Sequence, residues 1–207
     1  MAKKPKQGTD LLYTLIAQAR TYNDTIIMGR GDPDFDTPPH IRAAAIEAMK
    51  GHGNDYSPPE GILPLRQAIA ERVRRINGIE VDPETEVVVT NGGQEALFLM
   101  VLTAIGQGDE LIVPEPNYNT YADAMNFAGG VKVAVPTYAS EDFRVDPERV
   151  RKAITPRSRG LLLVSPNNPT ANVITREDMR SLVSLAQEHD LILLADDIYD
   201  LFMYDGH

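Results

Sequence analysis

Four short segments combine residue types that can bind a ligand and do chemistry on it. Each follows an apolar run that is typical of a buried strand, and between them the four segments carry glycines, prolines, amides, phenols and carboxylates. Backbone N–H groups can bind an anion, an aromatic ring can stack on a flat ligand, and a carboxylate can face a cation. The segments are residues 90–94 (TNGGQ), 114–118 (PEPNY), 165–170 (SPNNPT) and 196–199 (DDIY).

The glycines of the first segment predict an anion site. Gly92 and Gly93 let the backbone come close to a ligand, and a helix that begins at Gln94 would offer free N–H groups and a positive dipole end. In physical terms this is a phosphate cradle. Glycine at a tight turn before a helix is also common in α/β proteins, so an ordinary turn remains an alternative here.

Tyr118 and Asn168 lie in segments that are stiffened by proline. The ring of Tyr118 can stack on a flat aromatic ligand, or it can simply pack on its own helix. Two prolines fix the loop around Asn168, whose amide offers both donors and an acceptor. Because a structural turn rarely needs two prolines and two asparagines together, the loop around Asn168 favours a binding role.

Asp196 directly follows the last apolar run of the chain. A carboxylate at this position is costly to bury unless it meets a cation. Asp196 therefore either caps a helix or faces a protonated ring nitrogen of a ligand, with the Tyr199 hydroxyl turned into the same pocket.

The segments that must position these residues alternate between strand and helix. Strands without polar alternation are typical of a sheet that is covered on both faces. The expected fold is therefore α/β, a mostly parallel sheet with helices on both faces, whose ligands bind beyond the carboxyl ends of the strands. Strands are predicted at 87–90, 110–113, 131–135, 160–164 and 191–195, and helices at 10–20, 40–50, 61–77, 94–105, 118–127, 146–154 and 175–189.

The composition narrows the classes of function. The 207 residues carry a net charge of −10, which disfavours nucleic acid and anionic membranes as partners. They contain no cysteine, and the four histidines have no ligand spacing, so neither thiolate chemistry nor a metal site is expected. No apolar stretch is long enough to cross a bilayer and the basic start lacks a signal-peptide core, so we expect a cytoplasmic protein.

Six segments, taken in order, resemble the class I and II aminotransferases, the fold type I family that includes aspartate and aromatic amino-acid aminotransferases. The likeness covers about residues 10–205. It implies the transfer of an amino group between an amino acid and a 2-oxo acid with pyridoxal 5′-phosphate (PLP) as cofactor. The segments are GDPDFDTP (31–38), YSPPEGILPLR (56–66), TNGGQEAL (90–97), PEPNYNTY (114–121), SPNNPT (165–170) and DDIY (196–199).

The resemblance implies that two parts of the cofactor meet different segments. Gly92, Gly93 and Gln94 would bind its phosphate, largely through backbone N–H groups. Tyr118 would stack on the pyridine ring.

Three residues would act as catalytic groups by the same resemblance. Asn168 and Tyr199 would hydrogen-bond the 3-oxygen of the ring, and Asp196 would pair with the protonated ring nitrogen. That positive charge makes the ring an electron sink for the substrate α-carbon.

Two residues of the first loops complete the implied site. Gly31 would lie against the substrate carboxylate. Tyr56 would reach the phosphate of the neighbouring subunit, which implies a homodimer with shared active sites.

The chain departs from the usual family pattern at a few positions. Ala171 stands where the family usually has glycine after NPT, and Ser165 and Asp197 stand where asparagine and glutamate are commoner. If position 171 needs a positive φ, alanine is strained there by about 1 kcal/mol. We expect the other two exchanges to be tolerated.

A larger departure concerns lysine. The family has a Schiff-base lysine beyond the DxxY segment and a substrate-binding arginine later still, whereas this sequence ends at His207. Since that lysine both holds the cofactor and moves a proton, the 207 residues alone are expected to be inactive. The expected domains are an N-terminal arm with part of the small domain (1–40) and a large PLP-binding domain, truncated before the Schiff-base lysine (41–207). The chain's own lysines are Lys3, Lys4, Lys6, Lys50, Lys132 and Lys152.

Two alternatives to an aminotransferase fragment stay open. One is a natural half-length, non-catalytic protein that binds a phosphate ligand or pairs with a related subunit. The other is a PLP-dependent lyase or synthase on the same scaffold, because that chemistry shares the cofactor residues.

Overall fold

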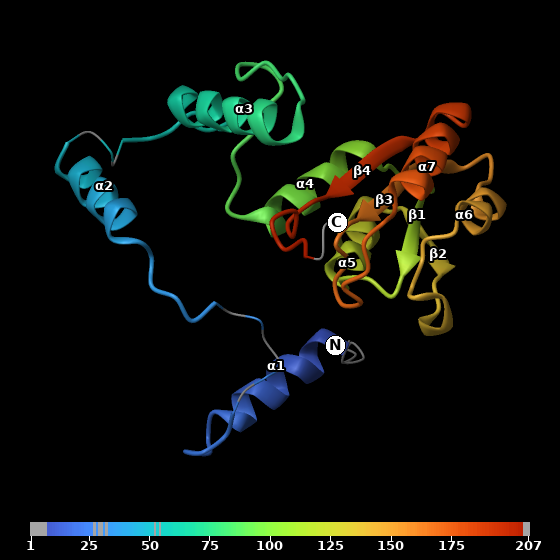
Figure 1. The fold of residues 1–207 in the computed structure, drawn as a ribbon, viewed down its shortest axis with the longest axis horizontal. Helices are drawn as coiled ribbons and strands as arrows, with labels where there is room; N and C mark the ends of the chain where they lie inside the picture. The colour runs from blue at the N-terminus through green and yellow to red at the C-terminus, as the bar shows by residue number, and fades with distance from the viewer. Residues whose placement is uncertain are drawn as a thin grey trace. The chain divides into compact units, whose positions relative to one another are not determined.

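The computed structural model describes residues 8–26, 28, 31, 33–51, 53 and 55–204. The chain divides into two units, Met1–Pro58 and Pro59–His207 (Figure 1). Within the described residues, no helix is long and apolar enough to cross a membrane.

The first unit contains two helices, α1 (Gly8–Ala19) and α2 (Pro39–Lys50). Helix α2 begins with proline, whose missing N–H would have no helical partner in the first turn, and it ends with Lys50 near the negative end of the helix dipole. Both helices begin within two residues of the predicted position. No residue of α2 is buried.

The second unit carries the sheet and the remaining helices. Four parallel strands lie in the order β2-β1-β3-β4, which confirms the predicted α/β class with a parallel sheet. The strands are β1 (Glu110–Glu115), β2 (Val131–Pro136), β3 (Ser158–Val164) and β4 (Ile192–Asp196), and the helices are α3 (Leu63–Asn77), α4 (Gly93–Ala104), α5 (Thr120–Ala128), η1 (Ala139–Glu141), α6 (Pro147–Ala153) and α7 (Arg176–Glu188).

Helices cover both faces of the two central strands and create two separate cores. Successive side chains of a strand point to opposite faces. Leu161 of β3 accordingly packs with residues of α6 and α7, whereas Leu162 packs with residues of α4 and α5. Figure 1 shows these helix pairs beside the sheet. Both leucines are fully buried, as expected for strands without polar alternation.

The two outer strands differ from that expectation. In β4, Leu193 and Ala195 are exposed while Leu194 is buried, and β2 is also partly open. Cover on both faces therefore holds for the two central strands, whereas side chains of the two edge strands stay partly exposed.

The predicted strand at 87–90 is also wrong. Val87 is buried, as an apolar run suggests, but the segment belongs to no strand of the described sheet. The N–H of Val89 donates to the carbonyl of Glu60 at 2.9 Å. An apolar run becomes a strand only when another strand satisfies its backbone groups, and this segment pairs with a loop.

Arg66 of α3 holds the segment before α4 in place. Its guanidinium is buried and donates to the carbonyls of Gly61 at 3.0 Å, Pro83 at 2.6 Å and Glu84 at 3.0 Å. A buried charge is tolerated only when its donors are satisfied. This one side chain therefore ties α3 to the turn that precedes residues 87–92.

Candidate active site

Three of the four predicted segments lie at one edge of the sheet. Asp196 ends β4 and pairs in register with Val164, which ends β3 and leads directly into the loop of residues 165–170. Strand β1, the other neighbour of β3, ends at Glu115, just before Tyr118. Parallel strands bring their carboxyl ends to the same edge, and this is where α/β proteins bind ligands.

The Asp196 carboxylate is held by donors from two different elements. Its Oδ2 accepts a hydrogen bond from the Tyr121 hydroxyl at 2.5 Å, and its Oδ1 accepts one from the backbone N–H of Ile198 at 3.2 Å. The helix-capping alternative is wrong, because the second contact leads into a turn at residues 198–201 and no helix begins there in the described residues. A carboxylate with a fixed orientation at this edge can receive a cationic group.

Tyr121 is a site residue that the sequence reasoning did not single out. Its side chain is fully buried in the core formed with α4 and α5. Burial, reinforced by the Asp196 carboxylate, raises the pKa of Tyr121 well above its usual value, so its hydroxyl stays a donor. The available signal was its place in the sequence, since it is a second tyrosine three residues after Tyr118.

The ring of Tyr118 meets the ring of Tyr121 edge to face, with centroids 6.3 Å apart and planes at 87°. Tyr118 is 39% exposed, so part of the ring is open to a ligand. Helix α5 begins at Thr120, two residues later than predicted. Tyr118 thus precedes the helix rather than lying within it.

Asn168 and Tyr199 come together from separate segments, as the shared role predicted for them requires. The Asn168 amide Nδ2 lies 3.4 Å from the Tyr199 hydroxyl, a long hydrogen bond. The Tyr199 ring packs against Phe202 at 6.2 Å between centroids. An amide and a phenol at this separation can share one acceptor atom of a ligand.

The glycines of the predicted cradle begin α4. Gly92 precedes the helix with φ of 80°, a conformation that favours glycine, and within the described residues no side chain caps the helix end. The Glu95 carboxylate accepts the N–H of Asn91 at 2.5 Å, one residue before the cradle. The first N–H groups of α4, including those of Gly93 and Gln94, therefore suit an anion.

The cradle and the acidic segment are neighbours. A Cβ built on Gly93 would lie 3.9 Å from the Cδ1 atom of Ile198, two residues after Asp196. The structure thus brings all four predicted segments to one edge of the second unit.

Gly31 and Tyr56 belong to the first unit, where both are exposed. The space around Gly31 is open, because a Cβ added there would meet no atom of the described residues within 4 Å. Their roles toward a substrate and a neighbouring subunit stay predictions.

Position 171 has the conformation that makes alanine unfavourable. Ala171 has φ of 58°, and its N–H donates to the Asn167 carbonyl at 2.8 Å, which closes the loop that carries Asn168. We expect Ala171→Gly to raise the free energy of unfolding by about 1 kcal/mol, because glycine adopts this conformation without strain. Urea denaturation of both proteins measures the change.

The control for that variant is Ala68→Gly in the interior of α3, at an exposed position. There the same exchange should lower the free energy of unfolding by about 1 kcal/mol, since glycine is a poor helix former. Equal signs for the two variants would contradict the strain at Ala171.

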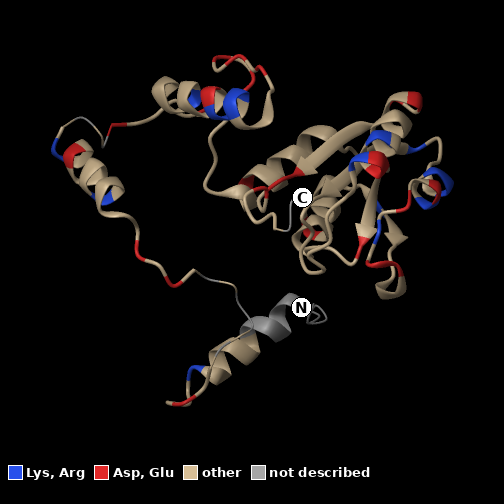
Figure 2. Ribbon diagram, viewed as in Figure 1, with Lys and Arg blue, Asp and Glu red and all other residues tan. Residues whose placement is uncertain are grey.

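None of the three described lysines belongs to the four segments of the site, and two of them form salt bridges. Lys50 pairs with Glu47 on α2, at 2.6 Å, and Lys132 of β2 pairs with Glu115. Lys152 is exposed near the end of α6. Figure 2 shows basic and acidic positions side by side on this helix. The lysines at positions 3, 4 and 6 lie outside the described residues.

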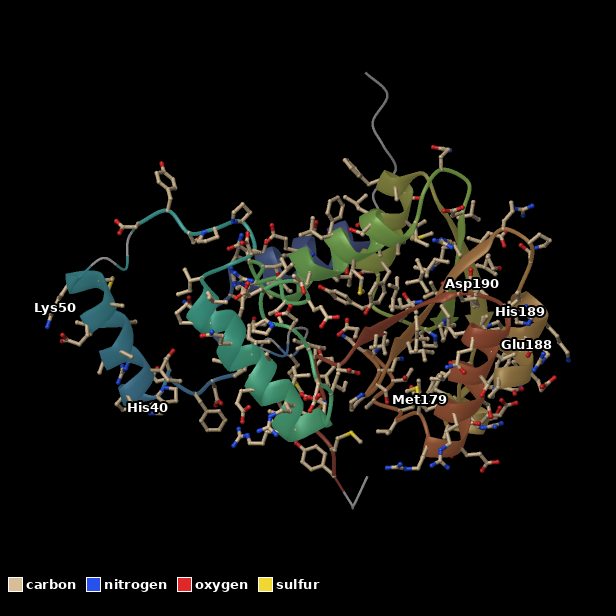
Figure 3. The ribbon with its side chains drawn as sticks, turned by 90° about the horizontal axis from the view of Figure 1, so that it is seen from above. His40, Lys50, Met179, Glu188, His189 and Asp190 are labelled. Atoms are coloured by element: carbon tan, nitrogen blue, oxygen red, sulfur yellow. The ribbon has the colours of Figure 1, made fainter. Side chains whose placement is uncertain are left out.

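The described histidines lie outside the four segments of this site. His189 follows α7, with its Nε2 3.8 Å from a Glu188 carboxylate oxygen, and His40 lies on α2 in the other unit (Figure 3). Over the part of the chain that the structure describes, no group of three or more acidic, histidine or cysteine residues could hold a metal ion.

Comparisons with known proteins agree with this arrangement. The family model for aminotransferase class I and II matches residues 23–207. An aspartate/prephenate aminotransferase of Thermus thermophilus is 47% identical over 205 residues, which are 99% of this chain and 53% of that protein. The aromatic-amino-acid aminotransferase 2 of Thermococcus litoralis is 41% identical over 181 residues, which are 87% of this chain and 46% of that protein.

Solved structures give the same result. The aspartate aminotransferase from Thermus thermophilus with maleate matches with a TM-score of 0.92 at 44% identity, over 99% of this chain and 53% of that one. The chain belongs to the class I and II aminotransferases. It spans about half the length of the curated relatives it matches.

Proposed function

We propose that the full-length protein is a PLP-dependent aminotransferase that moves an amino group between an amino acid and a 2-oxo acid. The observation that carries this proposal is the anchored Asp196 carboxylate at the carboxyl end of β4, beside the glycine cradle of α4. When bound, PLP supplies a protonated pyridine ring that draws electron density from the substrate α-carbon as a proton leaves it.

The residues present fit that cofactor. The open start of α4, with Gly92 at positive φ, suits the phosphate, and the partly exposed Tyr118 suits the flat ring. Asp196 would hold the proton on the ring nitrogen. Asn168 and Tyr199 lie close enough together to bind one ring oxygen between them.

Partners and location follow as parts of the same proposal. We infer a homodimer in which Tyr56 reaches the phosphate site of the neighbouring subunit, and a substrate carboxylate that lies against Gly31. The names of the relatives favour aspartate and aromatic amino acids as donors. A cytoplasmic enzyme with a domain boundary near residue 40 completes the proposal.

The test is a transamination assay of the purified full-length protein with PLP. L-Aspartate or L-phenylalanine is supplied with 2-oxoglutarate, and the new amino acid and the new 2-oxo acid are measured together. We expect the two products in equal amounts. Ammonia release without a 2-oxo acceptor would identify a lyase instead, and reversible PLP binding without products would identify a non-catalytic protein.

A further inference from the structure

Tyr121 is the most buried polar side chain near the site, and its hydroxyl has an unusual partner. The residue has no exposed surface and packs with Leu97, Val101 and Met125 in the core on the α4–α5 face of the sheet. Phenylalanine would fill the same space without a hydroxyl to satisfy. A buried hydroxyl must find an acceptor, and this one takes a carboxylate at 2.5 Å, the Oδ2 of Asp196.

We propose that Tyr121 is a positioning residue for Asp196, whose carboxylate it fixes in the orientation that meets the ring nitrogen of the cofactor. This inference rests on the proposed function, because the ring nitrogen belongs to PLP. Tyr121 acts through Asp196 and needs no contact with the cofactor or the substrate.

The geometry explains why a second donor is needed. Asp196 is the last residue of β4, so the regular strand ends there and does not fix the orientation of the side chain. The Ile198 N–H binds Oδ1 at 3.2 Å, which alone leaves the carboxylate free to turn about that contact. The Tyr121 hydroxyl comes from α5 on a different part of the fold and binds the other oxygen, so the plane of the carboxylate is fixed.

The hydrogen bond from Tyr121 also stabilises the negative charge of the Asp196 carboxylate. Hydrogen bonds to ionised groups are about twice as strong as those between neutral groups. The neutral phenol donates without adding a positive charge that would compete with a protonated ring for the carboxylate. Asp197, the neighbouring acid, has its pKa raised, first by burial and then by the charges of Asp200 and Asp196.

The test compares two cofactors on the full-length protein in its cofactor-free form. One is PLP, and the other is its 1-deaza analogue, in which carbon replaces the ring nitrogen while the phosphate and the aldehyde remain. We expect Tyr121→Phe to weaken PLP binding roughly tenfold and to leave binding of the analogue within about twofold of the wild type. Equilibrium dialysis measures both dissociation constants.

Two controls separate this role from a structural one. Tyr138→Phe alters an exposed tyrosine that stacks with Arg149 and follows β2, the outer strand on the opposite side of the sheet from β4, and it should change neither affinity. In an Asp196→Asn background, Tyr121→Phe should no longer discriminate between the two cofactors. Equal loss of both cofactors on Tyr121→Phe, or unchanged affinity for both, would overturn the positioning role.

The same design also distinguishes the inference from the function on which it rests. If the wild-type protein binds PLP no better than the 1-deaza analogue, the proposed function fails at Asp196 itself. If wild type prefers PLP and Tyr121→Phe keeps that preference, only the positioning role fails. Should Tyr121→Phe not fold, replacement of Tyr121 by 4-fluorophenylalanine keeps the shape of the side chain but removes the hydroxyl donor, and an unaltered ratio of the two affinities would then refute the role.

Discussion

Replacing Asp196 with alanine is expected to lower kcat of the full-length protein by about a thousandfold, with the fold intact. A preorganised charge that acts where charge develops is worth several kcal/mol in an active site, and loss of a single donor already costs a hundredfold to roughly a thousandfold. Asp196→Ala removes the carboxylate to which the proposal assigns the proton of the ring nitrogen. Steady-state transamination rates at saturating substrate measure the effect.

The matched control for that variant is Asp190→Asn. Asp190 lies just before β4, at the opposite end of the strand, and it is exposed with φ of 50° (Figure 3). Asparagine tolerates that conformation, so both kcat and stability should be unchanged. Near-normal turnover of Asp196→Ala, with the control also active, would remove Asp196 from its assigned role.

A polypeptide limited to these 207 residues is expected to show no transamination at all. Covalent attachment of the cofactor and proton transfer at the substrate both need a lysine amine in the site. Lys132, on the outer strand β2, forms a salt bridge with Glu115 of β1. Lys152 lies on α6, which packs on the same face of the sheet as α7. Neither can serve a site built around β4 and α4.

The measurement uses PLP with borohydride reduction, which fixes any imine, followed by peptide mass mapping. The 207-residue polypeptide should yield no stoichiometric label on one lysine and no product from an amino acid with a 2-oxo acid. The full-length protein, treated in parallel, should be labelled at a single lysine outside residues 1–207. A uniquely labelled lysine among the six in this sequence, together with turnover, would contradict the expectation.

The sequence predicted the central part of the fold because local pattern and tertiary environment agree there. Leucine and β-branched runs at β1 and β3 are buried on both faces, so hydrophobicity alone located them. The run at 87–90 has the same composition but lacks a strand neighbour among the described residues, and strand formation depends on that neighbour. The open faces of β2 and β4 escaped prediction for the same reason, since position in a sheet is not a local property.

The candidate site likewise has a part that the sequence could predict and a part that depends on tertiary packing. Motif order located the cradle, Tyr118, Asn168, Asp196 and Tyr199, because such segments must follow strands and begin helices at fixed places. The sequence analysis made the strain at Ala171 depend on a positive φ, and the φ of Ala171 is 58°. The Tyr121–Asp196 contact joins positions 75 residues apart, and only the packing of α5 under the sheet edge creates it.

The hydrogen bond between Tyr121 and Asp196 links the orientation of the carboxylate to the packing of the hydrophobic core. Val101 and Met125 share their core with Tyr121, although neither belongs to any binding motif. A smaller side chain at either position leaves room for the phenol to shift, and interiors relax only partially around such gaps. On the proposed role of Tyr121, residues with no chemistry of their own therefore help to set the orientation of the Asp196 carboxylate.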